Sequence, residues 1–297
     1  GIAKHNSCRA ILVCCLCAGE HICPIILPAA GNSRQWIACK HVNAIYKRLL
    51  KEQFELGLFE NPYVDPNRAA YLVGNASFQR KADLAQRKSI VLLQNKSLLP
   101  LPTAKDDSLR LFVMGINPKA FTPANWPKTK VTSGDYRKKG QSMPAINKNT
   151  NYAIIAVQVT NDSGPDFPFG GAIPEELNAL AFSDMAKSKS WKMTPSLDEI
   201  QTIMKAIGAE KTILAISFRQ PYVIDRESGM LDAGTILATF GVSDAALLDV
   251  ISGKFKPVGK LPFALANSAK AIVDQQPDAP GYKKEDTLFP FGFGLSY

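Results

Sequence analysis

The chain has 297 residues, 46% of them hydrophobic, which is enough to bury the core of one large domain or two small ones. Its formal net charge is +9, but residues 1–150 hold 22 Lys and Arg against 9 Asp and Glu, whereas the remainder holds 13 against 17. Because the basic residues are scattered, the charge favours a solvated surface, and no nucleic-acid partner is expected.

Cysteine and histidine are confined to the start of the chain. All six cysteines lie at or before Cys39, and all three histidines lie at or before His41. The later part of the chain therefore excludes a nucleophile activated by His, a catalytic thiolate, and a zinc site built on His or Cys. No cofactor and no metal are expected, and any chemistry there must use carboxylates, hydroxyls, Lys or Arg.

The opening segment, residues 1–42, differs in texture from the rest. Its apolar runs are interrupted by Glu20 and Pro24, so no membrane span is expected. Lys4 and Arg9 precede a short apolar run, which is the order of a signal peptide, and that reading stays open. The preferred interpretation is an unassigned segment, disordered or artefactual and without a packed core, because neither helical nor strand periodicity organises it.

A helix is expected next. Ile45, Leu49 and Phe54 stand near helical spacing, and the pattern stops at Gly57 and Pro62. Residues 43–108 are therefore interpreted as a terminal helix followed by a linker.

The remainder, residues 109–297, alternates buried strands with helices. Ser196 and Glu199 form a capping box at the start of a helix that Gly208 ends, and a further helix runs from Ser243 to Ser252 before Gly253. The strands are apolar without polar alternation, as parallel strands covered on both faces require, and they span Leu109–Asn117, Asn151–Val159, Lys211–Phe218 and Thr235–Gly241. The fold class predicted is α/β, with a parallel or mostly parallel sheet flanked by helices on both faces.

Several sequence motifs occur in an ordered series. GLFENPY follows the first helix, SIVLLQN precedes an LLPL turn, and the chain closes with GKLP in Gly241–Leu265 and FGFGLSY in Thr287–Tyr297. Over residues 43–297 this series resembles family 3 glycoside hydrolases. The resemblance implies the last helix of an N-terminal (β/α)8 barrel and then a C-terminal α/β sandwich domain over residues 109–297.

The resemblance also implies a reaction. Retaining glycosidases use two carboxylates, one as nucleophile and one as general acid and base. The family takes its nucleophile, an Asp, from the barrel, which is missing here apart from its last helix. The acid/base often comes from the second domain, so this chain is expected to be inactive without its N-terminal barrel partner.

The loop after the strand that ends at Val159 should supply the acid/base, because the carboxyl edge of a parallel sheet forms the binding crevice. Glu175 and Glu176 are the candidate acid/base residues, although Pro174-Glu175-Glu176 also reads as an ordinary first helical turn. The candidate substrate-binding residues are Asp166, Phe167, Phe169, Trp191 and Arg219, with Asp162 and Asp225 nearby in sequence.

Each candidate has a structural alternative. Trp191 would stack on a sugar ring or fill a half-buried loop position, and Arg219 and Asp225 would bind sugar hydroxyls or form a structural ion pair. Two functions are therefore kept: a β-glucosidase-type hydrolase acting on an oligosaccharide or β-glycoside substrate, and a non-catalytic carbohydrate-binding or structural module. Export to the periplasm or the cell exterior is expected from the same resemblance.

Overall fold

The computed structural model describes residues 25–26, 36–37, 39–103, 108–135, 142–162, 174–176, 179–276, 278 and 280–297. The expectation that residues 1–42 lack a packed core falls almost wholly outside these residues. The chain divides into two compact units, Gly1–Asn75 and Ala76–Tyr297.

The first unit is mostly helical in its described part, with one short antiparallel strand pair. The expected helix is confirmed as α2, and Gly57 takes a φ of +68° where the chain leaves it. The Asp65 side chain caps the next helix by accepting hydrogen bonds from the amides of Asn67 and Arg68. The elements of this unit are β1 (Ile25–Ile26), β2 (Trp36–Ile37), α2 (Cys39–Glu55) and α3 (Pro66–Leu72).

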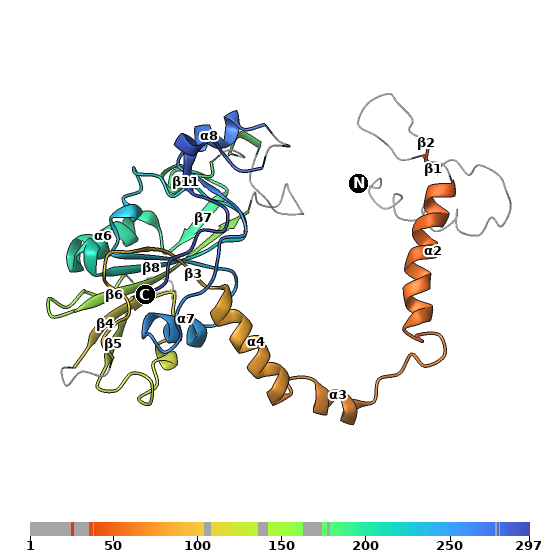
Figure 1. Ribbon diagram of the computed structural model, residues 1–297, viewed down its shortest axis with the longest axis horizontal. Coiled ribbons are helices and arrows are strands. Elements are labelled where there is room, and N and C mark those ends of the chain that lie inside the picture. Colours follow the sequence, from red (N-terminus) through yellow and green to blue (C-terminus); the bar gives the residue numbers. More distant parts are fainter. Residues whose placement is uncertain are drawn as a thin grey trace, which may run out of the picture. The chain divides into compact units, whose positions relative to one another are not determined.

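The second unit is built on one mostly parallel sheet with the strand order β3-β9-β8-β6-β4-β5 (Figure 1). β3 runs antiparallel to β9, and the other neighbours in this order run parallel. This arrangement confirms the expected sheet. Its strands are β3 (Val91–Asn95), β4 (Arg110–Met114), β5 (Lys130–Ser133), β6 (Tyr152–Asn161), β7 (Trp191–Thr194), β8 (Thr212–Ser217) and β9 (Thr235–Thr239). β10 (Leu265–Ala266) and β11 (Thr287–Phe289) form a separate two-stranded antiparallel sheet.

Helices cover both faces of this sheet, as expected. Alternate residues of a strand point to opposite faces, so Phe112 of β4 belongs to the core cluster that includes α6, whereas Val113 belongs to the cluster that includes α7. Both side chains are fully buried. The helices of this unit are α4 (Ala76–Ser89), α5 (Phe182–Met185), α6 (Leu197–Ile207), α7 (Asp244–Ile251) and α8 (Ala269–Asp274).

The predicted helix caps are present. The Glu199 carboxylate accepts a hydrogen bond from the Ser196 amide at 2.7 Å, and the Glu199 amide donates to the Ser196 hydroxyl at 3.3 Å. This reciprocal pair satisfies two amides at the start of α6. The Ser243 hydroxyl likewise accepts the Ala246 amide at the start of α7.

The terminal motifs close the sheet at β3. The Leu295 amide donates to the Leu92 carbonyl oxygen at 2.8 Å. A Cβ at Gly259 would lie 2.3 Å from the Ile90 carbonyl oxygen, and a Cβ at Gly294 would lie 2.2 Å from the Gly259 carbonyl oxygen. Only glycine allows these two close backbone approaches, which explains why GKLP begins with Gly259 and why FGFGLSY contains Gly294.

Candidate functional site

Strand β6 reaches beyond the carboxyl edge of the sheet. Its pairing with β8 ends at Val157, and residues 158–161 pair instead with β7. β4 lies between β5 and β6 in the strand order. The strand that follows β4 in sequence therefore lies on one side of it and the next strand lies on the other, which makes β4 the point where the strand order reverses. In doubly wound folds the ligand crevice lies at such a switch point, outside the carboxyl ends of the strands.

A pocket of about 380 Å³ opens at this edge on the side of β8 and β9. Arg219 is exposed there and follows β8 directly. Polar side chains from β6 and β8 face it beside aromatic ones, which is the mixed lining of a small-molecule site. The lining residues are Gln158, Val159, Thr160, Ser217, Phe218, Arg219, Phe240 and Gly241.

Glu176 lies in a network of hydrogen bonds at the base of the β6–β7 hairpin. One carboxylate oxygen accepts the Lys189 amide at 2.7 Å, and the other accepts the Ser190 amide at 2.9 Å and the Ser190 hydroxyl at 2.5 Å. The Trp191 indole donates to the Glu176 carbonyl oxygen at 3.1 Å. Both the main chain and the side chain of Glu176 are therefore tied to the start of β7.

These contacts govern the protonation of Glu176. The hydrogen bond from the Ser190 hydroxyl, together with those from the Lys189 and Ser190 amides, holds the pKa of the Glu176 carboxyl below its usual range. Hydrogen bonds donated to a carboxylate stabilise the charged form. Glu176 therefore remains an acceptor at neutral pH, and its neighbour Glu175 is exposed.

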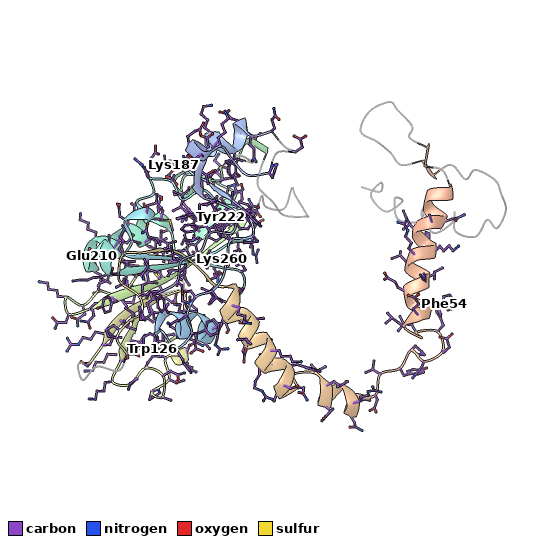
Figure 2. All side chains as sticks on the ribbon, in the orientation of Figure 1. Phe54, Trp126, Lys187, Glu210, Tyr222 and Lys260 are labelled. Carbon is purple, nitrogen blue, oxygen red and sulfur yellow. The ribbon has the colours of Figure 1, made fainter. Side chains whose placement is uncertain are left out.

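Trp191 lies in the core rather than on the surface. Its side chain is 5% exposed, and its ring meets that of Tyr222 edge-on at 6.4 Å between centroids. Tyr222 also stacks on Phe218 at 5.6 Å and is labelled within the packed side chains of the second unit in Figure 2. Burial raises the pKa of the Tyr222 hydroxyl. A tryptophan packed in this way presents no open face to a sugar.

Arg219 and Asp225, which are near in sequence, have different surroundings: Arg219 lines the pocket, and Asp225 accepts hydrogen bonds from backbone amides. The Asp225 carboxylate accepts the Ser183 amide at 3.1 Å and the Ser228 amide at 2.9 Å, which fixes two loops. Asp162 lies at the end of β6, where its carboxylate is 3.6 Å from the Lys192 ammonium. Of these charged groups, only Arg219 lines the pocket at the carboxyl edge.

Asp166, Phe167 and Phe169 lie outside the described residues. Their assignment as substrate-binding residues stays a prediction.

A second pocket, of about 300 Å³, lies on the other side of the β6–β7 hairpin and was not foreseen from the sequence. It is lined by Met114, Asp135, Met193, Thr194, Pro195, Ser196 and Glu199. Asp135 accepts the Gly115 amide at 3.1 Å, and Gly115 takes a φ of +75°. A glycine directly after a buried strand is the sequence signal that marks this edge.

Within the described ranges, no group of three or more His, Cys, Asp or Glu side chains is placed to hold a metal ion. Among the same residues, none of the helices combines the length and the apolar character needed to cross a bilayer.

The second unit is thus an α/β domain of the doubly wound class, with a pocket and carboxylates at the carboxyl edge of its sheet. The particular family follows from the sequence. Residues 90–297 match the family described as glycosyl hydrolase family 3 C-terminal domain, and the chain belongs to this family.

Curated relatives include a probable beta-glucosidase C of Aspergillus oryzae, which is 32% identical over 86% of this chain and 35% of its own length. A periplasmic beta-glucosidase/beta-xylosidase of Dickeya chrysanthemi is 31% identical over 84% of this chain and 33% of its own length. The chain therefore spans about one third of the length of these relatives.

Solved structures share the fold. A β-glucosidase from Erythrobacter marinus aligns with a TM-score of 0.57 and 17% identity over 84% of this chain and 39% of that protein. A β-glucosidase from Listeria innocua, solved with isofagomine, aligns with a TM-score of 0.52 and 20% identity over 84% of this chain and 38% of that protein. At these identities the likeness supports the fold.

Proposed function

We propose that this chain is the second domain of a retaining glycoside hydrolase of the β-glucosidase type, which removes sugars from the non-reducing ends of β-glycosides. The family match over residues 90–297 carries the proposal, supported by the names of the relatives. Arg219 in the pocket at the carboxyl edge is suited to sugar hydroxyls, and the exposed Glu175 carboxyl is suited to a glycosidic oxygen.

In this proposal the chain contributes one of two catalytic carboxylates. Glu175 is the proposed acid/base, because its side chain is exposed, whereas both oxygens of Glu176 accept hydrogen bonds. The nucleophile would come from an N-terminal domain, which must bring its own carboxylate to about 5–5.5 Å from the acid/base. Without that nucleophile neither the glycosyl intermediate nor the charge of the transition state is supported, so the chain alone should not turn over.

The test compares the purified chain with a two-domain polypeptide, in which the N-terminal part of the Dickeya chrysanthemi relative precedes residue 43 of this chain. The chain alone should hydrolyse aryl β-glucosides no faster than buffer, and the two-domain polypeptide should hydrolyse them. Hydrolysis by the chain alone would show that both carboxylates lie within it and would refute the proposed division of labour.

The second function is a non-catalytic carbohydrate-binding module, favoured by the pocket that Arg219 lines. Calorimetric titration of the chain with short β-glucosides separates the two functions. Binding by the chain, together with a two-domain polypeptide that never hydrolyses, would favour the module.

We further propose export to the periplasm or the cell exterior, since the relative from Dickeya chrysanthemi is named periplasmic. Fractionation of the source cells, with detection by an antibody against the chain, tests this location.

A further inference from the structure

Ser190 connects the two ends of the segment that runs from residue 163 to residue 173. On one side, the Asp162 amide donates to the Ser190 carbonyl oxygen at 2.8 Å. On the other side, the Ser190 amide and hydroxyl both donate to the Glu176 carboxylate. Ser190 is 1% exposed, so these bonds are shielded from water on its side. One buried serine therefore binds both Asp162, the residue that follows β6, and the turn that carries Glu175.

Both carboxylate oxygens of Glu176 accept hydrogen bonds in this arrangement. Three donors meet its two oxygens, and all three favour the ionised form. The Lys189 ammonium also acts on this carboxylate and favours its charged form. A general acid must carry a proton and deliver it to the leaving oxygen. The three donors instead stabilise the ionised form of Glu176, which carries no proton to deliver.

We propose that Glu176 is a positioning residue, which anchors the turn Pro174–Glu176 to Ser190 and so holds the neighbouring Glu175 in place as acid/base. The assignment of Glu175 rests on the proposed function, whereas the anchor itself does not. The anchor acts through both the side chain and the main chain of Glu176, because its carbonyl oxygen also accepts the Trp191 indole. The backbone of Glu175 is thus fixed while its side chain stays exposed.

The anchor is tested on the complete 297-residue chain by amide hydrogen exchange. Glu176→Gln replaces one carboxylate oxygen, which now accepts a hydrogen bond from a backbone amide, by an NH₂ group that cannot accept one. Hydrogen exchange of the Lys189 and Ser190 backbone amides should therefore become about 10- to 100-fold faster. Ser190→Ala removes the hydroxyl alone and should have a smaller effect. Two matched controls, Glu175→Gln and Glu199→Gln, should leave both amides unchanged. Unchanged exchange in Glu176→Gln would overturn the anchor.

The positioning role is tested on the two-domain polypeptide with two substrates. A methyl β-glucoside has a poor leaving group and needs a general acid, whereas a dinitrophenyl β-glucoside needs little proton donation. Glu175→Gln should lower turnover of the methyl β-glucoside about 10²- to 10⁴-fold, and it should hardly slow formation of the glycosyl intermediate from the dinitrophenyl β-glucoside. It should also remove the alkaline limb of the profile of turnover against pH.

Glu176→Gln should behave differently. Turnover of both substrates should fall about 10- to 100-fold, because the turn is misplaced, and the alkaline limb should remain. Loss of the alkaline limb in Glu176→Gln, with its retention in Glu175→Gln, would make Glu176 the acid and overturn the proposal. If the parent two-domain polypeptide is inactive, the proposed function fails, while the exchange measurement still decides the anchor.

Discussion

Both units of the chain hold large apolar side chains, but the two units bury them to different extents. In the first unit α2 and the segment after it leave their large apolar side chains in the open, and Phe54 is 58% exposed. In the second unit Phe112 is fully buried between the sheet and its helices. The comparison teaches that periodicity predicts where a helix lies, whereas burial of its apolar side chains requires a second surface for them to pack against.

The exposed residues of the first unit are numerous and close together in sequence. They include Ile45, Leu49, Leu50, Phe54, Leu56, Leu58, Phe59, Tyr63 and Val64. Phe54 and Phe59 contact one another at 4.4 Å between ring centroids, which covers little of either ring. Apolar groups in such numbers are typical of a surface that another domain covers. This is where the proposed N-terminal domain would pack.

A matched pair of phenylalanine substitutions tests the comparison most strongly. Phe112→Ala should destabilise the chain by about 3–5 kcal/mol, because it leaves a cavity in the core. Phe54→Ala should change stability by less than about 0.5 kcal/mol. Urea unfolding followed by circular dichroism measures both. If the two substitutions lower the free energy of unfolding by the same amount, side-chain packing does not distinguish the two units.

The two-domain polypeptide sharpens this test. There Phe54→Ala should become costly if the N-terminal domain covers α2, and the cost should exceed that in the chain alone. Equal costs in the two contexts would mean that α2 is not part of the interface.

Ion pairs give the next largest contrast. The Arg87 guanidinium lies 2.7 Å from the buried carboxylate of Asp249, and the Lys254 ammonium lies 3.5 Å from the same group. Arg87→Met should cost about 1–3 kcal/mol, since it removes the shorter of the two ion pairs and leaves the buried Asp249 carboxylate with Lys254 alone. Lys51→Met breaks the exposed Lys51–Glu55 pair of α2 and should cost at most about 0.5 kcal/mol. A large loss in the Lys51 variant would contradict the comparison.

The smallest expected effect concerns high pH. The Tyr297 hydroxyl donates to the Val250 carbonyl oxygen, and burial raises the pKa of Tyr297 to about 12. In the unfolded chain the Tyr297 hydroxyl ionises near pH 10. The free energy of unfolding that this group contributes is therefore fully present below about pH 10 and should decline as the pH rises towards 12. Tyr297→Phe should weaken this decline, measured by urea unfolding at pH 8 and pH 11. Tyr63→Phe, at an exposed position of the first unit, is the control and should leave the decline unchanged.

Local signals in the sequence determined the elements of the second unit. The apolar runs predict β4, β6, β8 and β9, and the Ser196–Glu199 capping box predicts the start of α6. Each of these signals lies within a few residues, so no knowledge of the fold is needed to read it. The terminal motifs are also short, continuous stretches that can be read without the fold, and the chain they close belongs to the matched family.

Tertiary structure alone decided how the candidate carboxylates differ. Glu175 and Glu176 are adjacent and chemically identical, so no pattern separates them. The β6–β7 hairpin brings Ser190 to Glu176 across 14 positions of sequence, and the same hairpin buries Trp191 against Tyr222. These contacts depend on pairing between distant segments, and the free energy of such pairing is not encoded in any single stretch of residues.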